Sequence, residues 1–131
     1  MIAYVRTVEG TFAVDLEDGL VLGESDEEVT PERVELELPR LVGASASGSA
    51  VIALVDRRPP LLVSGDGGAT WREAGGGLPA GFAVALDPEH PDRALYAART
   101  RLYLSIDGGR FWRGLDPELP DIEAVAWARE S

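Results

Sequence analysis

The chain lacks both cysteine and lysine, and it has a single histidine among its 131 residues. Without cysteine it can form neither a disulfide bond nor a thiolate metal site. All 12 of its basic residues are arginines, so no side-chain amine is present for Schiff-base chemistry. No uninterrupted apolar run approaches the roughly 18 residues that a membrane-spanning helix needs. These absences exclude disulfide-framework proteins and helical membrane proteins from the sequence-based interpretation.

Positive charge is also scarce. The chain has 23 acidic residues and a formal net charge of −11. Such a surface repels phosphate backbones and anionic lipid headgroups, so we expect neither nucleic acid nor a membrane as a partner. Residues 1–10 lack the basic start and the apolar core of a signal peptide. We therefore expect a cytoplasmic protein.

The pattern of apolar residues predicts an all-β domain. Hydrophobic residues make up 45% of the chain, which is ordinary for a single globular domain of this length. Short apolar or alternating runs are separated by glycine, proline and aspartate, and none has a sustained helical period. Strands are predicted near residues 2–7, 11–16, 20–23, 33–38, 41–45, 50–55, 61–64, 70–74, 81–86, 94–98, 102–105, 111–114 and 122–128.

Two segments of the chain repeat each other position by position. Residues 61–71 read LLVSGDGGATW and residues 102–112 read LYLSIDGGRFW, and a Leu-Pro pair follows each. A degenerate copy of this segment lies one repeat length earlier. In it, Leu20–Leu22 align with the apolar residues that open the two later segments, and the acidic run Glu24–Glu28 replaces their Ser-x-Asp-x-Gly-x-x-Trp pattern. The single domain 1–131 is thus divided into units of about 1–40, 41–80 and 81–121, and a closing strand at 122–128. About 40 residues suit four short strands, as in one propeller blade.

The repeated Ser-x-Asp-x-Gly-x-x-Trp resembles the Asp-box, or BNR repeat, of sialidases, sortilin-type receptor domains and photosystem-assembly-factor-like propellers. The resemblance implies a hairpin between the third and fourth strands of a blade. The aspartate would accept bonds from backbone N–H groups, the glycines would adopt positive φ, and the tryptophan would pack beside the hairpin. Metal or ligand binding by the aspartates is the alternative. The residues given this structural role are Ser64, Asp66, Gly68, Trp71, Ser105, Asp107, Gly109 and Trp112.

Four arginines are candidates for ligand binding. Arg57 and Arg58 lie between the second and third predicted strands of the middle unit, and Arg99 and Arg101 occupy the matching loop of the last. In propellers this loop opens on the face that usually binds ligands, where guanidinium groups could hold a carboxylate or phosphate. Exposed arginines that pair with the plentiful acids are the alternative. In the first unit, we align Glu17–Gly19 with this loop.

No catalytic residue, metal site or cofactor is predicted. His90 stands in Asp87–Asp92, which resembles the turn between the first two strands of a blade, and a lone histidine makes a poor base or zinc site. The run Glu24–Glu28 could hold calcium, but it lacks the acid spacing and the glycine of a calcium loop. Sialidases have an arginine in a Phe/Tyr-Arg-Ile-Pro motif. The nearest match, Tyr4–Thr7, has an intervening valine and no proline, so the sialidase site is not carried over.

Three blades do not close a ring. Three blades of four strands also account for only the first twelve predicted strands, so the strand predicted at 122–128 is surplus. It resembles 82–86 and so reads as the first strand of a further blade. We expect a homodimer in which two three-bladed arcs form a six-bladed β-propeller. A compact, sandwich-like all-β monomer is the alternative. The expected function is that of a non-catalytic binding or scaffold protein for a protein or a small anionic or sugar ligand. The alternatives are a sialidase-like glycoside hydrolase with a site across two chains, and a purely structural assembly factor.

Overall fold

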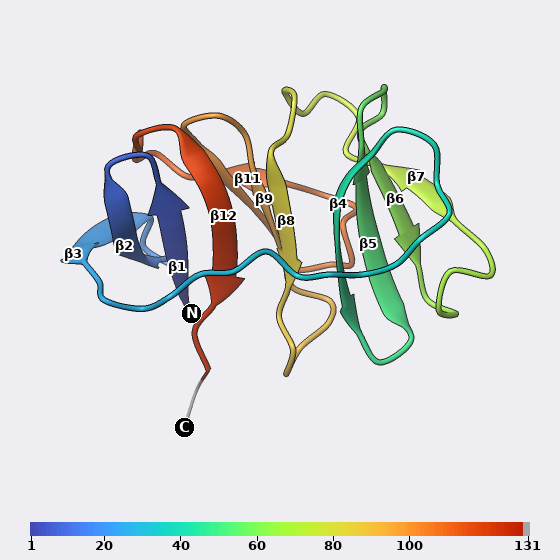
Figure 1. Ribbon diagram of the computed structural model, residues 1–131, viewed down its shortest axis with the longest axis horizontal. Helices are drawn as coiled ribbons and strands as arrows, with labels where there is room; N and C mark the ends of the chain where they lie inside the picture. The colour runs from blue at the N-terminus through green and yellow to red at the C-terminus, as the bar shows by residue number, and fades with distance from the viewer. Residues whose placement is uncertain (130–131) are drawn as a thin grey trace.

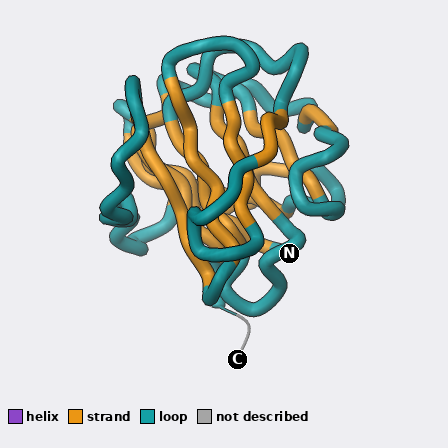
Figure 2. The backbone as a smooth tube through the Cα atoms, turned by 90° about the vertical axis from the view of Figure 1, so that its right-hand side faces the viewer, coloured by secondary structure: helices purple, strands orange, loops and turns teal. Residues whose placement is uncertain are grey.

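A computed structural model describes residues 1–129 of the chain, and in this part all regular structure is β-strand. The strands are β1 (Ile2–Thr7), β2 (Gly10–Asp15), β3 (Leu20–Glu24), β4 (Leu41–Ser47), β5 (Ala50–Val55), β6 (Leu61–Ser64), β7 (Arg72–Ala74), β8 (Ala83–Leu86), β9 (Ala94–Ala97), β10 (Leu102–Ser105), β11 (Arg113–Gly114) and β12 (Ile122–Trp127). They run between two ends at which the loops gather (Figure 2). The all-β prediction is confirmed.

The strands form three antiparallel sheets of four, which we name blades A, B and C. Blade A has the order β12-β1-β2-β3, blade B the order β4-β5-β6-β7, and blade C the order β8-β9-β10-β11. The first strands of the blades contact one another, β12 with β8 and β8 with β4, so blade C lies between the other two (Figure 1). The molecule is therefore an open arc of three blades.

Blade A is assembled from both ends of the chain. Strand β12 pairs antiparallel with β1, with Ala3 opposite Trp127 and Val5 opposite Val125. The backbone N–H of Ala128 also donates to the carbonyl of Ile2 at 2.9 Å. The interpretation of residues 122–128 as the start of a further blade is thus wrong, because this strand supplies the missing first strand of blade A.

The alignment of the first unit is displaced by one strand. Residues Leu20–Leu22 belong to the fourth strand of blade A, not to its third, and the loop that matches the arginine loops is Val8–Glu9 instead of Glu17–Gly19. The hairpin between the third and fourth strands is 16–19. There Asp15 Oδ1 accepts the backbone N–H groups of Glu17 and Asp18, at 3.0 and 3.2 Å. The acidic run 24–28 comes after this blade, so it does not replace an Asp-box.

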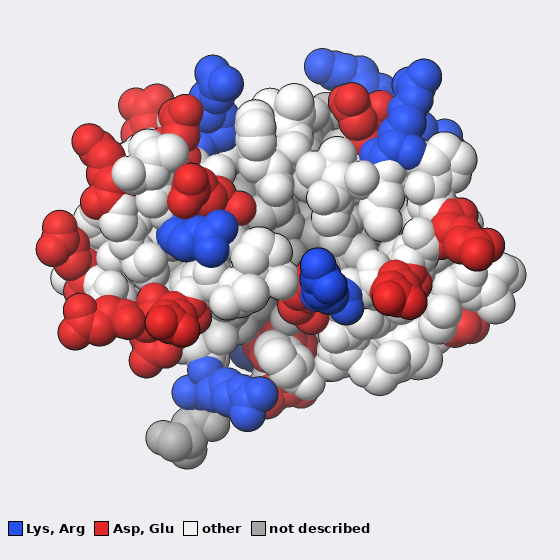
Figure 3. Space-filling view, viewed as in Figure 1, with Lys and Arg blue, Asp and Glu red and all other residues white. Residues whose placement is uncertain are grey.

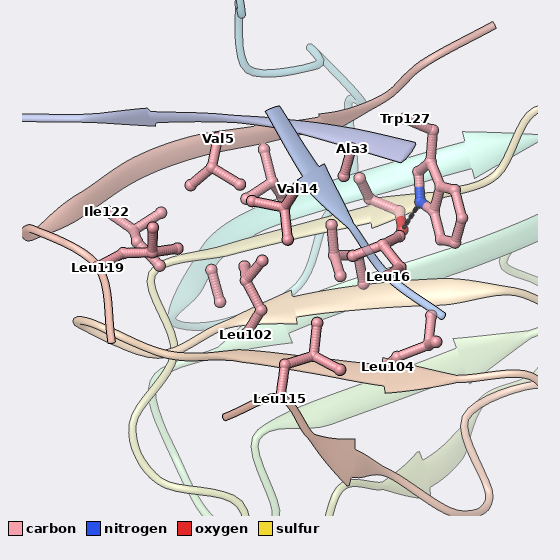
Figure 4. Close-up of a cluster of buried hydrophobic side chains, with 14 residues drawn as sticks. Ala3, Val5, Val14, Leu16, Leu102, Leu104, Leu115, Leu119, Ile122 and Trp127 are labelled. Carbon is pink, nitrogen blue, oxygen red and sulfur yellow. Dashed lines mark hydrogen bonds between the residues drawn. The ribbon is translucent and has the colours of Figure 1, made fainter. Parts of the chain in front are cut away.

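Apolar side chains fill both junctions between blades. Figure 4 shows the junction of blades A and C, where Val5, Val14 and Leu16 meet Leu102 and Leu104. In the junction of blades C and B, the aromatic side chains Tyr96, Tyr103 and Trp112 pack against Ile52, Leu54 and Leu61. Each junction also has a buried hydrogen bond between first strands: Trp127 Nε1 donates to the Ala85 carbonyl at 3.0 Å, and the Leu86 N–H donates to Ser45 Oγ at 2.8 Å.

Residues 25–40, which we call the strap, connect the last strand of blade A to the first strand of blade B. Figure 1 shows the strap passing across the first strands of the three blades, β12, β8 and β4, and then turning around blade B. Near its start Val29 is buried, and its carbonyl accepts a hydrogen bond of 2.8 Å from Arg6 Nη1 of blade A. Near its end Leu36 and Leu38 pack on the outer face of blade B. The strap therefore contacts both blades that lack a second neighbour.

The strand predicted at 33–38 does not form. Its alternation is real, because Val34, Leu36 and Leu38 are half-buried while the residues between them are exposed. The segment lies on the face of blade B, against Ala53, Leu62 and Trp71, where no strand edge offers hydrogen-bond partners. A period of two identifies an inward and an outward side, and it does not by itself show that a strand has a neighbour to pair with.

Truncation of the strap leucines tests whether this segment stabilises blade B. The double variant Leu36→Ala/Leu38→Ala removes apolar contact from both half-buried side chains, and we expect it to lower the free energy of unfolding by about 2–3 kcal/mol in total. The control is Leu22→Ala on β3, where the side chain is 57% exposed, and this change should cost under about 0.5 kcal/mol. Urea unfolding followed by tryptophan fluorescence measures both. Equal effects would show that the strap contributes nothing.

Candidate functional site

The first Asp-box forms the hairpin between β6 and β7. Ser64 Oγ donates to Asp66 Oδ1 at 2.7 Å and accepts the N–H of Gly68 at 2.8 Å. The N–H of Thr70 donates to Asp66 Oδ1 at 2.9 Å, and its hydroxyl donates to Asp66 Oδ2 at 2.6 Å. Gly68 has φ +96°, and a Cβ there would lie 3.3 Å from the Trp71 ring. Both carboxylate oxygens of Asp66 thus accept bonds from the hairpin itself.

The second Asp-box, between β10 and β11, repeats this arrangement. Asp107 Oδ1 accepts bonds from the Ser105 hydroxyl and from the N–H groups of Arg110 and Phe111, at 2.8 to 3.1 Å. These bonds favour the charged carboxylate. The hydroxyl and N–H of Thr70, followed by Ser64, lower the pKa of Asp66 from 3.8 to about 2, and the Phe111 N–H is the main cause of a lowered pKa at Asp107.

The arginine after each Asp-box tryptophan contacts the neighbouring blade, and these contacts were not predicted from the sequence. Arg72 Nη2 donates to the Gly108 carbonyl of blade C at 2.8 Å, and Arg113 Nη2 donates to the Leu16 carbonyl of blade A at 3.0 Å. Each side chain therefore reaches from its own blade to the next one. The signal was present, because Trp71-Arg72 and Trp112-Arg113 repeat at the same offset as the rest of the motif.

The four predicted arginines line two neighbouring hollows. Arg57 and Arg58 line a hollow of about 280 Å³, and Arg99 and Arg101 line another of about 480 Å³. Pro79 and Ala80 belong to both linings, so they separate the two hollows. Figure 3 shows basic side chains along the edge of the molecule where the loops leave β5 and β9. The structure thus brings together loops that lie one repeat apart in the chain.

Two of these arginines have long ionic contacts. Arg57 Nη2 lies 3.9 Å from Glu73 Oε2, and Arg99 Nε lies 3.8 Å from Asp121 Oδ2, both beyond hydrogen-bond length. Within residues 1–129, Arg58 forms no ion pair or side-chain hydrogen bond. Arg101 differs, because its Nε donates to the Leu115 carbonyl at 2.7 Å. Arg57, Arg58 and Arg99 thus have donors to offer, while Arg101 uses one to hold the chain after β11.

Aromatic rings accompany the arginines in the larger hollow. The Arg99 guanidinium carbon lies 5.9 Å from the centre of the Phe82 ring, and that of Arg101 lies 5.6 Å from the centre of the Tyr103 ring. Phe82 is 45% exposed, which is high for a large apolar side chain. An apolar ring beneath a guanidinium group can support a planar or apolar group while the arginine binds an anion. Phe82 is not among the site residues predicted from the sequence, since an isolated phenylalanine carries no motif.

Tyr96 holds the wall between the two hollows in place. It is fully buried, and its hydroxyl donates to the Pro79 carbonyl at 2.6 Å. Burial raises the pKa of Tyr96 to about 12, so the hydroxyl keeps its proton and remains a donor. Gly81 makes room for this hydroxyl, because a Cβ at that position would overlap with it.

The remaining candidate positions have local partners. His90 lies in the turn between β8 and β9, the first two strands of blade C, and its Nδ1 is 3.7 Å from Asp87 Oδ2. Arg6, from the segment compared with the sialidase motif, bonds to the strap at Val29.

Among residues 1–129, no three side chains of the metal-binding types are grouped so that they could hold an ion. In the same range, no helix has the length and apolar character to cross a membrane.

Solved structures resemble the chain, although no family model and no curated protein matches it. A crystal structure of a GH74 enzyme from Niastella koreensis matches with a TM-score of 0.52 and 21% identity, over 90% of this chain and 18% of that one. The structure of YCF48 bound to a D1 peptide matches with a TM-score of 0.53 and 16% identity, over 92% of this chain and 39% of that one.

The chain consists of propeller blades. At these identities the likeness concerns the fold, and it confirms the resemblance to Asp-box propellers that the repeated motif indicated. The chain spans less than half the length of either matched protein. Three blades in an open arc thus correspond to part of each of those larger structures.

Protonation of the first Asp-box aspartate should weaken the fold in acid. The folded pKa of Asp66 is lowered, so its contribution is complete above about pH 4 and is lost as the pH falls toward 2. We expect Asp66→Asn to be less stable than the wild type at pH 7, and this difference should shrink between pH 4 and pH 2. Urea midpoints at each pH measure it, with the exposed Asp26→Asn as a control for lost charge. A difference that stays constant with pH would contradict the role given to the carboxylate.

Substitution of Gly81 should disturb both hollows. In Gly81→Ala the new methyl group overlaps with the Tyr96 hydroxyl, so we expect a loss of about 1–3 kcal/mol in stability. The same change at Gly76, where a Cβ meets nothing within 4 Å, should cost less than half as much. The ring edge of Tyr96 is crowded as well as its hydroxyl, so the matched background is Tyr96→Ala. If Gly81→Ala costs as much in that background as in the wild type, crowding by Tyr96 is not the cause. Thermal unfolding measures all of these variants.

Proposed function

We propose that the protein is a non-catalytic, propeller-type binding module that recognises an anionic group, on a protein or on a small molecule, at its arginine-bearing end. The observation that carries the proposal is the pair of adjoining hollows, with Arg57 and Arg58 on one and Arg99 on the other. Guanidinium groups with free donors form charge-assisted bonds to carboxylate, phosphate or sulfate.

The charge of the rest of the molecule gives these arginines a role in selectivity. The formal net charge is −11, so an anionic ligand is repelled by most of the surface and is attracted only where basic groups gather. The long contacts to Glu73 and Asp121 support the proposal, because pairs at 3.8 to 3.9 Å between exposed groups cost little to break.

A peptide is one form that the ligand can take. The matched structure of YCF48 has a bound D1 peptide, and a peptide would present a carboxylate beside apolar side chains. Phe82 and Tyr103 in the larger hollow offer the apolar contact, and Arg99 offers the charge. We propose acidic peptides and small anionic or sugar acids as ligands, and the cytoplasm as the setting.

Glycoside hydrolysis is the second candidate function, and the likeness to a GH74 enzyme is the observation that favours it. Such chemistry requires two carboxyl groups that face each other across a groove, about 5–9.5 Å apart. Release of nitrophenol from a panel of nitrophenyl glycosides would favour the enzyme. Binding of the same sugars without turnover would favour the binding module.

The six-bladed ring formed by two chains belongs to the same proposal, as the form in which the arginine ends of two arcs would face one funnel. The ring would require the strap to leave the outer face of blade B, where Leu36 and Leu38 now pack. Light scattering on a sizing column separates the two forms, since the chain mass is 14.0 kDa. A mass near twice this value would support the ring, and a mass of one chain at all concentrations would favour the strapped arc.

Removal of the arginines should first weaken and then abolish anion binding. We expect citrate, N-acetylneuraminate or an acidic peptide to shift the amide NMR signals of the non-proline residues in 56–60, 78–82 and 98–103. Arg57→Ala/Arg58→Ala should weaken this binding at least tenfold, and adding Arg99→Ala should remove it. The matched control, Arg33→Ala/Arg129→Ala, removes the same charge from exposed positions elsewhere and should bind as the wild type does. Equal loss in the control would show that net charge decides binding and that no site exists.

A further inference from the structure

The outer strand of blade A differs from the outer strands of the other two blades. Strand β3 (Leu20–Glu24) has five residues, whereas β7 has three and β11 has two. Each of the two short strands begins with an arginine that reaches to the neighbouring blade. Short edge strands that carry charge are protected against pairing with another chain. Strand β3 is longer than both, its single charged residue, Glu24, stands at its last position, and the register shift in its pairing with β2 lies on β2, between Ala13 and Val14.

Strand β3 presents apolar side chains to solvent together with a free backbone edge. Within residues 1–129 it pairs only with β2, so the N–H and C=O groups of its other edge have no strand of this range beside them. Three consecutive large apolar residues are exposed there, Leu20 by 55%, Val21 by 40% and Leu22 by 57%. An exposed apolar edge strand is a template to which an extended segment can add as a further strand.

Acidic residues surround this edge. Residues 7–32 contain nine acids and no basic residue. Glu17 and Asp18 lie in the hairpin before β3, and Glu24 and the exposed Asp26–Glu28 lie at its end and beyond. Figure 3 shows acidic side chains gathered over the side of the molecule where β3 lies. Because both ends of the strand are acidic, an occupant with basic residues at both ends would have complementary charge.

The same charges argue against a second copy of this chain as the occupant. If two β3 strands paired antiparallel about a twofold axis, the hairpin acids of one copy would lie against the acids that follow β3 in the other. A parallel pair would place like ends together and would also oppose acid with acid. Both arrangements are repulsive between copies with a net charge of −11 each.

We propose that the free edge of β3 binds an extended polypeptide segment of about five to seven residues, apolar in its middle and with lysine or arginine at both ends. The segment adds to blade A as a fifth strand. Its backbone supplies hydrogen bonds, its apolar side chains cover Leu20 and Leu22, and its basic ends lie near Glu17 and Glu24. This surface is separate from the arginine-bearing end. Because acids surround β3 and arginines line the two hollows, the two sites recognise ligands of opposite charge.

A labelled synthetic peptide, Lys-Val-Thr-Val-Thr-Val-Lys with blocked ends, is the probe, and fluorescence anisotropy is the measurement. We expect binding to the wild type, and we expect affinity to fall as salt is raised, since the contacts at the ends of the strand are ionic. An analogue N-methylated at every inner amide keeps the charge and apolar groups but cannot pair with a strand, and it should not bind. The peptide with glutamate in place of both lysines should not bind either.

The variant Leu20→Ser/Leu22→Ser removes the apolar surface, and it should weaken binding of the lysine peptide about tenfold or more. The control Val42→Ser removes another exposed apolar side chain, 50% exposed and on blade B, and should leave binding unchanged. Circular dichroism checks that both variants fold. Arg57→Ala/Arg58→Ala should bind the peptide as the wild type does, so failure at one site does not decide the other.

Three results would overturn the proposal. Undiminished binding of the N-methylated peptide, or of the peptide to Leu20→Ser/Leu22→Ser, would show that charge alone attracts it. Absence of binding at millimolar peptide would show that the edge takes no strand of this chemistry. A concentration-dependent dimer that Leu20→Ser/Leu22→Ser abolishes would assign the edge to a second copy of the chain.

Discussion

The arc depends on the antiparallel pairing of β12 with β1. Without this pairing blade A would have three strands, and it would lose the side of its sheet that meets blade C. Trp127 illustrates the dependence, since its indole nitrogen bonds to the Ala85 carbonyl of β8. Residues of β12 and β1 bury themselves together against blade C, so the two ends of the chain are fixed by one apolar junction. The four-stranded blade A is therefore complete only when the last strand of the chain has joined the first.

An open arc leaves blades A and B with one neighbouring blade each, so one face of each blade must be covered in another way. The chain covers these two faces unequally. At blade B, Trp71 and Leu62 correspond in position to Trp112 and Tyr103 of blade C, and the strap leucines take the place of a further blade. At blade A the strap contributes Val29 and leaves much apolar surface uncovered, including that of β3. The strap is thus a substitute for blades at one end of the arc and only a partial cover at the other.

The sequence predicts what repeats and misses what occurs once. The Asp-box copies identify two blades, and their regular spacing places Arg57 and Arg99 in equivalent loops. The first unit has no Gly-Gly and no tryptophan, so its alignment depends on Leu20–Leu22, and leucine-rich triplets fit a third or a fourth strand equally well. The pairing of β12 and the path of the strap are long-range features without a local signal. Phe82 joins the arginine hollow through packing alone, so no pattern could indicate it.

The shared position of the two chain ends has a mechanical consequence. Ile2 lies at the start of β1 and Trp127 at the end of β12, and the two strands are antiparallel neighbours, so both ends leave the same end of blade A (Figure 1). Tension applied between them would load the hydrogen bonds of this pair one after another, as a zipper opens, instead of shearing them all at once. The protein should thus yield at low force, first at blade A, while the paired blades B and C still hold.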